Sequence, residues 1–264
     1  DCHNWNSLLV EATTTMKFKG TALMAAVFLS LVLYYFFVDL PALQKENSEK
    51  ELADKILPLD AKKVVEFSLT RNGKPITLRR TGPNNWGLTQ PLSSPGDSTE
   101  AEAFISEIEA LKKTRVVEEN PKDLSIYGLG SPFMKIHFNI ENKTSETLLI
   151  GDESPMGGGL YFKRESQPAV MMALASQSQF QKSVYNFRDK TLLSFSTGNI
   201  KRIKINREAH PLELVKKDDV WKVSGALGAK GDKDAIMKFL QSIQFSKIQE
   251  FVDENPDSLE LYGL

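Results

Sequence analysis

Cysteine and histidine are scarce in this sequence: there is one cysteine, Cys2, and there are three histidines in 264 residues. A single cysteine excludes an internal disulfide and a thiolate metal cluster. The histidines His3, His137 and His210 are far apart along the chain, and we expect His137 to be a surface or core residue of a strand rather than a ligand. The sequence therefore predicts no metal site, and the fold must depend on packing.

Net charge is also lacking, because 33 basic residues face 34 acidic ones. Such a chain has no field that would gather nucleic acid or an anionic membrane surface, so we expect no nucleic-acid partner. With 41% hydrophobic and 25% charged residues the composition is that of an ordinary globular protein. The length leaves room for about two domains.

Recognisable catalytic motifs are missing as well. Gly157-Gly158-Gly159 has neither the lysine nor the strand-to-helix context of a phosphate-binding loop, so we interpret it as a hairpin turn. Asp152-Glu153 lies beside that turn and is expected to be solvated rather than to chelate a cation. No serine, cysteine or carboxylate arrangement with a placed partner group is legible. We therefore predict no catalytic, cofactor-binding or metal residue, no cofactor, and no enzymatic activity.

One long stretch without charge is present near the start of the chain. It runs from Gly20 to Val38, follows Lys17 and Lys19, and has tyrosines near its far end. At about 1.5 Å per residue, a helix of this length matches the roughly 30 Å hydrocarbon layer of a membrane. We predict a transmembrane anchor at residues 16–40, with the lysines in the cytoplasm and everything after Asp39 outside it.

A buried core helix and a cleaved signal peptide are the alternatives for this stretch. Its apolar core is longer than that of most signal peptides, and Leu40-Pro41-Ala42 lacks the usual cleavage pattern, which favours an uncleaved anchor. Residues 1–15 precede the first methionine, Met16, and we interpret them as a non-native leader. Residues 41–58 mix charges with helix formers and are predicted to be a helical polar stalk.

A duplication organises the rest of the chain. The stretch 118–129 returns almost unchanged as 253–264, a spacing of 135 residues. The same spacing relates three further pairs: Trp86 and Trp221, Asp97 and Asp232, and Phe104 and Phe239. A repeat of this length is a whole domain rather than the short unit of a solenoid. We predict an α+β fold with two tandem antiparallel-sheet-plus-helix modules, the first at 59–196 and an incomplete second at 197–264, and we expect the natural protein to continue beyond it.

Each module is predicted to begin with three strands. In the first, alternating residues on either side of Asn72-Gly73, the dipeptide that most readily turns a hairpin, give two strands, and Trp86 marks the third. The second module has one residue fewer before its tryptophan, because Pro75 and Pro211 lie 136 positions apart. Turn lengths vary between copies of a module, whereas strand faces do not.

A helix is predicted to follow the strands. Asp97 should cap it, with Glu100 completing a capping box, and Asp232 should cap the second helix without that glutamate. The apolar residues of the first helix share one face, and three glutamates are expected to face water: Glu102, Glu107 and Glu109. Four more alternating runs between Met134 and Met172 predict an antiparallel meander in the first module.

Seven short motifs occur in order between residues 55 and 264. They are Leu57-Pro58-Leu59-Asp60, the strand with Trp86, Pro95-Gly96-Asp97, Tyr127-Gly128-Leu129 with Pro132, Leu149-Ile150-Gly151, Gly159-Leu160-Tyr161 and Phe187-Arg188-Asp189-Lys190. Together they resemble the bacterial family called domain of unknown function 4340. The resemblance implies a membrane-anchored protein, often encoded beside the subunits of a gliding-motility-type ABC transporter. It supplies no catalytic residues, since none are established for the family.

Two functions remain open. The first is a single-pass protein of the bacterial cytoplasmic membrane whose extracytoplasmic part binds a protein partner, such as ABC transporter subunits, or an envelope polymer. The second is an envelope hydrolase or polymer-modifying enzyme whose carboxylates come from separated strands. A cleft with two carboxylates of perturbed pKa would favour the enzyme. An exposed apolar patch would favour the binding protein.

Overall fold

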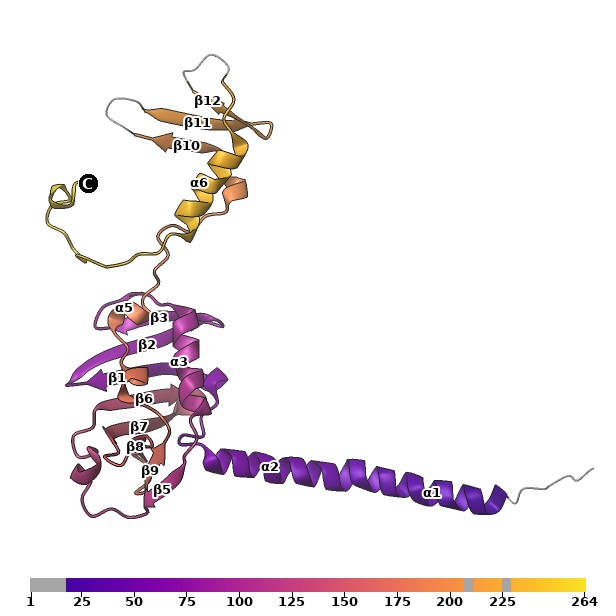
Figure 1. Cartoon of the computed structure of the whole chain (residues 1–264). Helices are drawn as coiled ribbons and strands as arrows, with labels where there is room; N and C mark the ends of the chain where they lie inside the picture. The colour runs from indigo at the N-terminus through magenta and orange to yellow at the C-terminus, as the bar shows by residue number, and fades with distance from the viewer. Residues whose placement is uncertain (1–17, 207–210, 225–228) are drawn as a thin grey trace, which may run out of the picture. The chain divides into compact units, whose positions relative to one another are not determined.

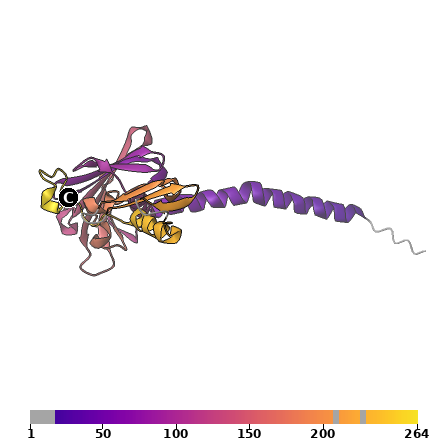
Figure 2. The ribbon, with the colours of Figure 1, turned by 90° about the horizontal axis from the view of Figure 1, so that it is seen from above.

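The chain begins with one long helix. The computed structural model describes residues 18–206, 211–224 and 229–264, so the predicted leader and His210 lie outside the described residues. Helix α1 (Phe18–Tyr34), a π-helical segment η1 (Tyr35–Asp39) and helix α2 (Leu40–Asp54) continue as one rod in Figures 1 and 2. The π-helical turn precedes Pro41, which cannot donate a backbone hydrogen bond and commonly causes such irregularity.

The first half of this rod is apolar and exposed, and the second half is polar. By length and composition Leu23–Asp54 can cross a membrane, and it is the one such helix among the described residues. The expected helical stalk is present in α2, where Lys50 pairs with Glu46 at 2.7 Å. Exposed pairs of this kind contribute little to stability, so the stalk is a solvated helix. It ends at Asp54, however, and Ile56 and Leu57 of the predicted stalk are buried in the main core instead.

The unit Ile56–Leu264 is built on a nine-stranded antiparallel sheet. Its strands, in spatial order, are β4 (Ser94–Pro95), β3 (Asn85–Gln90), β2 (Lys74–Gly82), β1 (Val64–Arg71), β6 (Met134–Ile140), β7 (Thr144–Glu153), β8 (Leu160–Arg164), β9 (Val170–Ala173) and β5 (Arg115–Glu118). Figure 1 shows this order from β3 to β5. The α+β class is therefore confirmed.

The predicted hairpin and meander are both present. Asn72 and Gly73 join β1 to β2 with φ of 52° and 74°, the left-handed conformation that a tight hairpin turn requires. The four runs from Met134 onward pair in sequence order as β6 to β9. Strand β5 was not predicted. It precedes the meander in the sequence but pairs with β9, and so it forms the last strand at that edge of the sheet.

Helix α3 (Ser98–Ala110) covers one face of the sheet. Its buried residues are Ala101, Phe104, Ile105 and Ile108. They join sheet residues and two short helices, α4 (Gln177–Phe180) and α5 (Val184–Phe187), in the main core. The ring of Phe104 lies 5.7 Å from both Phe67 and Phe187. An aromatic cluster at the centre of this layer therefore holds helix, sheet and α5 together.

The capping box predicted for α3 does not form. Asp97 does cap the helix, since its carboxylate accepts the backbone N–H of Glu100 at 3.1 Å. The side chain of Glu100, however, pairs with Lys182 at 2.7 Å, and the backbone N–H of Asp97 donates to the carbonyl of Phe187 at 2.8 Å. The carbonyl of Phe187, at the end of α5, therefore accepts the hydrogen bond that the Glu100 side chain would accept in a capping box.

The glutamates expected to face water are all half-buried. Glu102 accepts the indole N–H of Trp86 at 2.8 Å and pairs with Arg80, also at 2.8 Å. Burial raises the pKa of Glu107, opposed by the nearby charge of Lys182. The prediction that these glutamates face water was wrong, because Arg80 of β2 and Lys182, which follows α4, lie against this side of the helix.

The duplicated stretch 118–129 covers part of the opposite face. A short helix η3 (Ser125–Tyr127) ends in Gly128 at φ 66°, and Tyr127 donates to Glu118 at 2.7 Å, which raises the pKa of the tyrosine. The Tyr127 ring lies 5.0 Å from that of Tyr161, and Leu129 is buried beside it. This stretch therefore seals a second, smaller core.

A separate three-stranded antiparallel sheet follows. It consists of β10 (Arg202–Ile205), β11 (Leu212–Lys217) and β12 (Val220–Val223), with helix α6 (Lys233–Phe245) behind them. Its core is made by Leu214, Trp221, Ile236 and Leu240. Asp232 caps α6 as predicted, accepting the backbone N–H groups of Asp234 and Ala235.

Candidate functional site

The described residues considered as possible metal ligands, His137 and Asp152-Glu153, lie on different strands. His137 lies in β6, with one ring nitrogen 2.9 Å from the Thr147 hydroxyl and the other 3.1 Å from the Asn139 side chain. Both ring nitrogens are thus occupied by neighbours in the sheet. Glu153 accepts the backbone N–H of Gln177 at 3.1 Å. Among the described residues no group of three or more His, Cys, Asp or Glu is arranged to hold a metal.

The glycine triplet is the turn between β7 and β8. Gly157, Gly158 and Gly159 have φ of 76°, 94° and 134°, all in the left-handed region. The backbone N–H of Ser154 donates to the carbonyl of Gly159 at 2.9 Å and closes the turn. The hairpin interpretation is confirmed.

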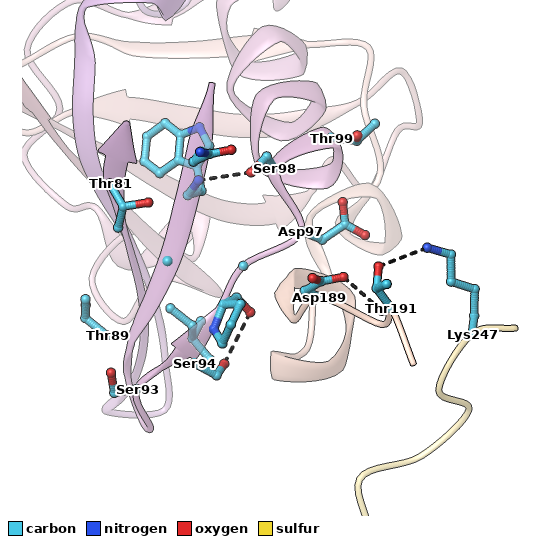
Figure 3. Close-up of a pocket in the computed structure, with 16 residues that line it drawn as sticks. Thr81, Thr89, Ser93, Ser94, Asp97, Ser98, Thr99, Asp189, Thr191 and Lys247 are labelled. Atoms are coloured by element: carbon cyan, nitrogen blue, oxygen red, sulfur yellow. Dashed lines mark hydrogen bonds between the residues drawn. The ribbon is translucent and has the colours of Figure 1, made fainter. Parts of the chain in front are cut away.

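A groove of about 680 Å³ lies beside β3 and the start of α3 (Figure 3). Most of its polar lining consists of hydroxyl groups. The polar residues are Thr81, Asn85, Thr89, Ser93, Ser94, Asp97, Ser98, Thr99, Asp189, Thr191 and Lys247. Four parts of the chain contribute: the hairpin region of β2 to β4, the first turn of α3, the segment after α5, and Lys247 from the segment after α6.

Close backbone packing forms the inner wall of the groove. The N–H of Gly96 donates to the Trp86 carbonyl at 3.0 Å, and the N–H of Trp86 donates to the Ser98 hydroxyl at 3.0 Å. A Cβ at Gly96 would lie 2.8 Å from the Trp86 carbonyl oxygen, so only glycine fits there. The Pro95-Gly96-Asp97 motif therefore fixes the wall and starts α3 at the same time.

The charged residues of the groove already have structural partners. Asp97 caps α3 and pairs with Lys190 at 3.2 Å. Asp189 accepts the N–H of Thr191 at 2.8 Å, and Lys247 donates to the Thr191 hydroxyl at 3.3 Å. Among the described lining residues no hydroxyl donates to a carboxylate or a histidine. The arrangement offers hydrogen-bonding hydroxyls for a polar ligand rather than an activated nucleophile.

This groove was not predicted from the sequence. Pro95-Gly96-Asp97 was predicted as a cap and a family motif, but the serines and threonines around it were not expected to form a site. The density of hydroxyls between Thr89 and Thr99 was the available signal. Their convergence with Asp189 and Thr191 depends on contact between the segment after α5 and β4, where the N–H of Asp189 donates to the Pro95 carbonyl at 3.0 Å.

Comparison with protein families gives one result. The model of the family described as "Domain of unknown function (DUF4340)" matches residues 86–264. The chain belongs to this family. The match begins at Trp86, so it includes most of the DUF4340 motifs named above and leaves out Leu57-Pro58-Leu59-Asp60. Neither the curated proteins nor the solved structures contained a match to this DUF4340 chain.

Proposed function

We propose that this chain is a single-pass, membrane-anchored component of the bacterial envelope whose part after Asp39 lies outside the cytoplasm and binds a partner. The observation that carries the proposal is the exposed apolar helix of α1, which continues into a charged stalk. An apolar helix of this length is stable in a bilayer and costly to expose to water. The groove supports a binding role, because its two carboxylates, Asp97 and Asp189, already make hydrogen bonds that stabilise the fold.

The proposed partner is a protein of a gliding-type ABC transport system. The test is a pull-down of the full-length protein from detergent-solubilised membranes at low and moderate salt. Co-purification of transporter permease or accessory subunits is expected with the wild-type chain, and it should weaken with Ser93→Lys on the groove. Recovery of the protein without any membrane partner under both salt conditions would count against this role.

Orientation gives a further prediction. Lys17 and Lys19 precede the apolar stretch, and positive charge is retained on the cytoplasmic side. A reporter enzyme that works only outside the cytoplasm, fused after Leu193, should be active. The matched control is the same fusion with Lys17→Glu and Lys19→Glu, which should lower that activity. Activity of a cytoplasmic reporter fused after Leu193 would show that the orientation is reversed.

We also propose that the two sheets are tandem copies of one module, and the strand registers support this. In the first sheet Phe67 lies opposite Leu78, Leu78 opposite Leu88 and Arg80 opposite Trp86. In the second sheet the corresponding pairs are Ile203 with Leu214, Leu214 with Val223 and Lys216 with Trp221. The one-residue difference in spacing falls in the turn before each tryptophan, where it changes no strand face.

Local hydrogen bonds agree with the same correspondence. The N–H of Gly231 donates to the Trp221 carbonyl at 2.8 Å, as Gly96 does to Trp86. Tyr262 donates to Asp253 at 3.1 Å, in the positions that correspond to Tyr127 and Glu118. Because the same contacts recur at sites 135 residues apart, a shared module accounts for both.

A further inference from the structure

The hairpin of β1 and β2 carries two facing cations at its turn. Arg71 and Lys74 are direct partners in the strand register, on either side of Asn72-Gly73. Side chains alternate along a strand, so both cations lie on the face that carries Leu69 and Ile76. Like charges directly opposite each other in a sheet repel and destabilise it. The hairpin therefore contains a repulsion that its turn does not require.

These two charges are not neutralised within the described part of the chain. Neither Arg71 nor Lys74 makes an ion pair or a side-chain hydrogen bond with a described residue. The guanidinium of Arg71 lies 4.5 Å from the centre of the Phe133 ring, a contact that orients it and leaves its charge in place. On the same hairpin Arg79 pairs with Glu66 at 2.6 Å. The pair at the turn thus lacks the acidic partner that another arginine of the hairpin has.

A pocket of about 550 Å³ is lined by the two cations and by a mainly apolar wall. The described lining residues are Arg71, Gly73, Lys74, Pro75, Ile76, Gln90, Pro91 and Val184, and none of them is a carboxylate. Ile76 and Val184 are half-buried and pack against the main core. Pro75 and Pro91 have no backbone N–H to donate. The pocket thus joins exposed positive charge to an apolar wall with few hydrogen-bond donors.

We propose that this pocket binds a phosphate monoester that carries one alkyl or acyl chain. The phosphate, which has about two negative charges at neutral pH, lies between Arg71 and Lys74 and removes their repulsion. The chain lies against Ile76 and Val184 and buries apolar surface there. A peptide fits less well, because the prolines of the wall cannot donate to its backbone carbonyls. The pocket shares no lining residue with the groove beside β3, so this inference goes beyond the binding role proposed above.

Isothermal titration calorimetry of the full chain in phosphatidylcholine nanodiscs tests the pocket, with empty nanodiscs as the blank. Octyl phosphate is the probe, because its short chain keeps it soluble. It should bind at least about tenfold more tightly than inorganic phosphate, which lacks the chain, and than octanol, which lacks the charge. Equal affinity for inorganic phosphate would overturn the role of the apolar wall. Equal affinity for octanol would overturn the role of the cations.

Two further ligands test the headgroup and the chain. Octanoate has a single negative charge and should bind less tightly than octyl phosphate, because one of the two cations stays uncompensated. Octanoate binding as tightly as octyl phosphate would contradict the assignment of a phosphate. A short apolar peptide with a free carboxyl end should bind more weakly than either, and a preference for this peptide would refute the alkyl or acyl chain.

Substitutions locate the binding on the chain. Lys74→Gln removes one exposed charge and should weaken octyl phosphate binding by about tenfold, the size of one charge-assisted contact. Lys122→Gln is the matched control, because it removes an exposed charge outside the pocket and should leave the affinity unchanged. Full affinity of the Lys74→Gln chain, or an equal loss in both variants, would show that octyl phosphate binds elsewhere.

Thermal unfolding provides a second measurement that also shows whether the variants fold. Without ligand, Lys74→Gln should unfold at a slightly higher temperature than the wild-type chain, because it relieves the repulsion with Arg71. Octyl phosphate should raise the unfolding temperature of the wild-type chain more than that of the variant, since a ligand stabilises the state that binds it. A variant that unfolds at a lower temperature, or an equal rise in both proteins, would refute the proposed site.

Discussion

Replacing Trp86 with alanine is expected to lower the free energy of unfolding of the first module by about 3–5 kcal/mol, the usual cost of removing a large aromatic side chain from a core. The indole is 2% exposed and lies 5.3 Å from the Phe67 ring. It also donates to Glu102 at 2.8 Å and lies beneath the guanidinium of Arg80 at 4.6 Å. Alanine would therefore leave both a cavity and a half-buried carboxylate with one donor fewer.

Denaturant unfolding followed by far-ultraviolet circular dichroism measures this effect. Trp86→Phe is the control for volume, since it keeps most of the ring and removes the indole N–H, and it should cost clearly less than alanine. Trp221→Ala is the control for location: Trp221 belongs to the small core of the second sheet and should leave the transition of the first module in place. An unchanged midpoint for Trp86→Ala would place the ring outside the core.

Alternation and turn chemistry were sufficient to predict most of the sheet. Period-two apolar patterns identified seven of the strands, since each has one face on the main core, and Asn72-Gly73 fixed the register of the first hairpin. Strand β5 escaped prediction because only four residues, Arg115–Glu118, form it and its pairing with β9 is remote in sequence. The two-residue β4 gives no periodic signal at all.

Side-chain partnerships were the least predictable feature. Glu100 was assigned to its own helix cap, yet its partner is Lys182, 82 positions away. A local motif indicates which hydrogen bonds a side chain can make within its own helix. A charged side chain from elsewhere in the fold forms a stronger hydrogen bond and is preferred as the partner. The same reason explains Glu102, which follows the helical pattern of a solvated residue and lies against Arg80 and Trp86 instead.

The candidate groove shows why a binding site is harder to predict than a core. Its hydroxyls carry no spacing rule comparable to a phosphate loop or a metal motif. They become a site because Asp189 and Thr191 are brought to β4 by backbone bonds that sequence periodicity does not encode. The long apolar helix was predictable for the opposite reason, since a bilayer imposes a length and a composition on any helix that spans it.

Gly159→Ala is expected to destabilise the meander strongly. Gly159 has φ of 134°, and a Cβ there would lie 1.8 Å from the carbonyl oxygen of Ala173. A left-handed conformation costs a residue with a side chain about 1–3 kcal/mol, and forced movement of packed backbone adds about 1–3 kcal/mol. Leu160 would be displaced from its pairing with Ala173, which joins β8 to β9. The free energy of unfolding and the exchange rates of the β8 and β9 amides measure the loss.

Gly157→Ala is the matched control, because it changes the same turn without the overlap. Gly157 also has a left-handed φ, of 76°, but nothing lies within 4 Å of a Cβ built there. It should carry the conformational cost alone and leave the pairing of β8 with β9 intact. Equal losses for the two variants would mean that strain in the turn, rather than the close approach to Ala173, makes glycine necessary at position 159. A large difference would instead establish that the turn is held by the packing of β9 against it.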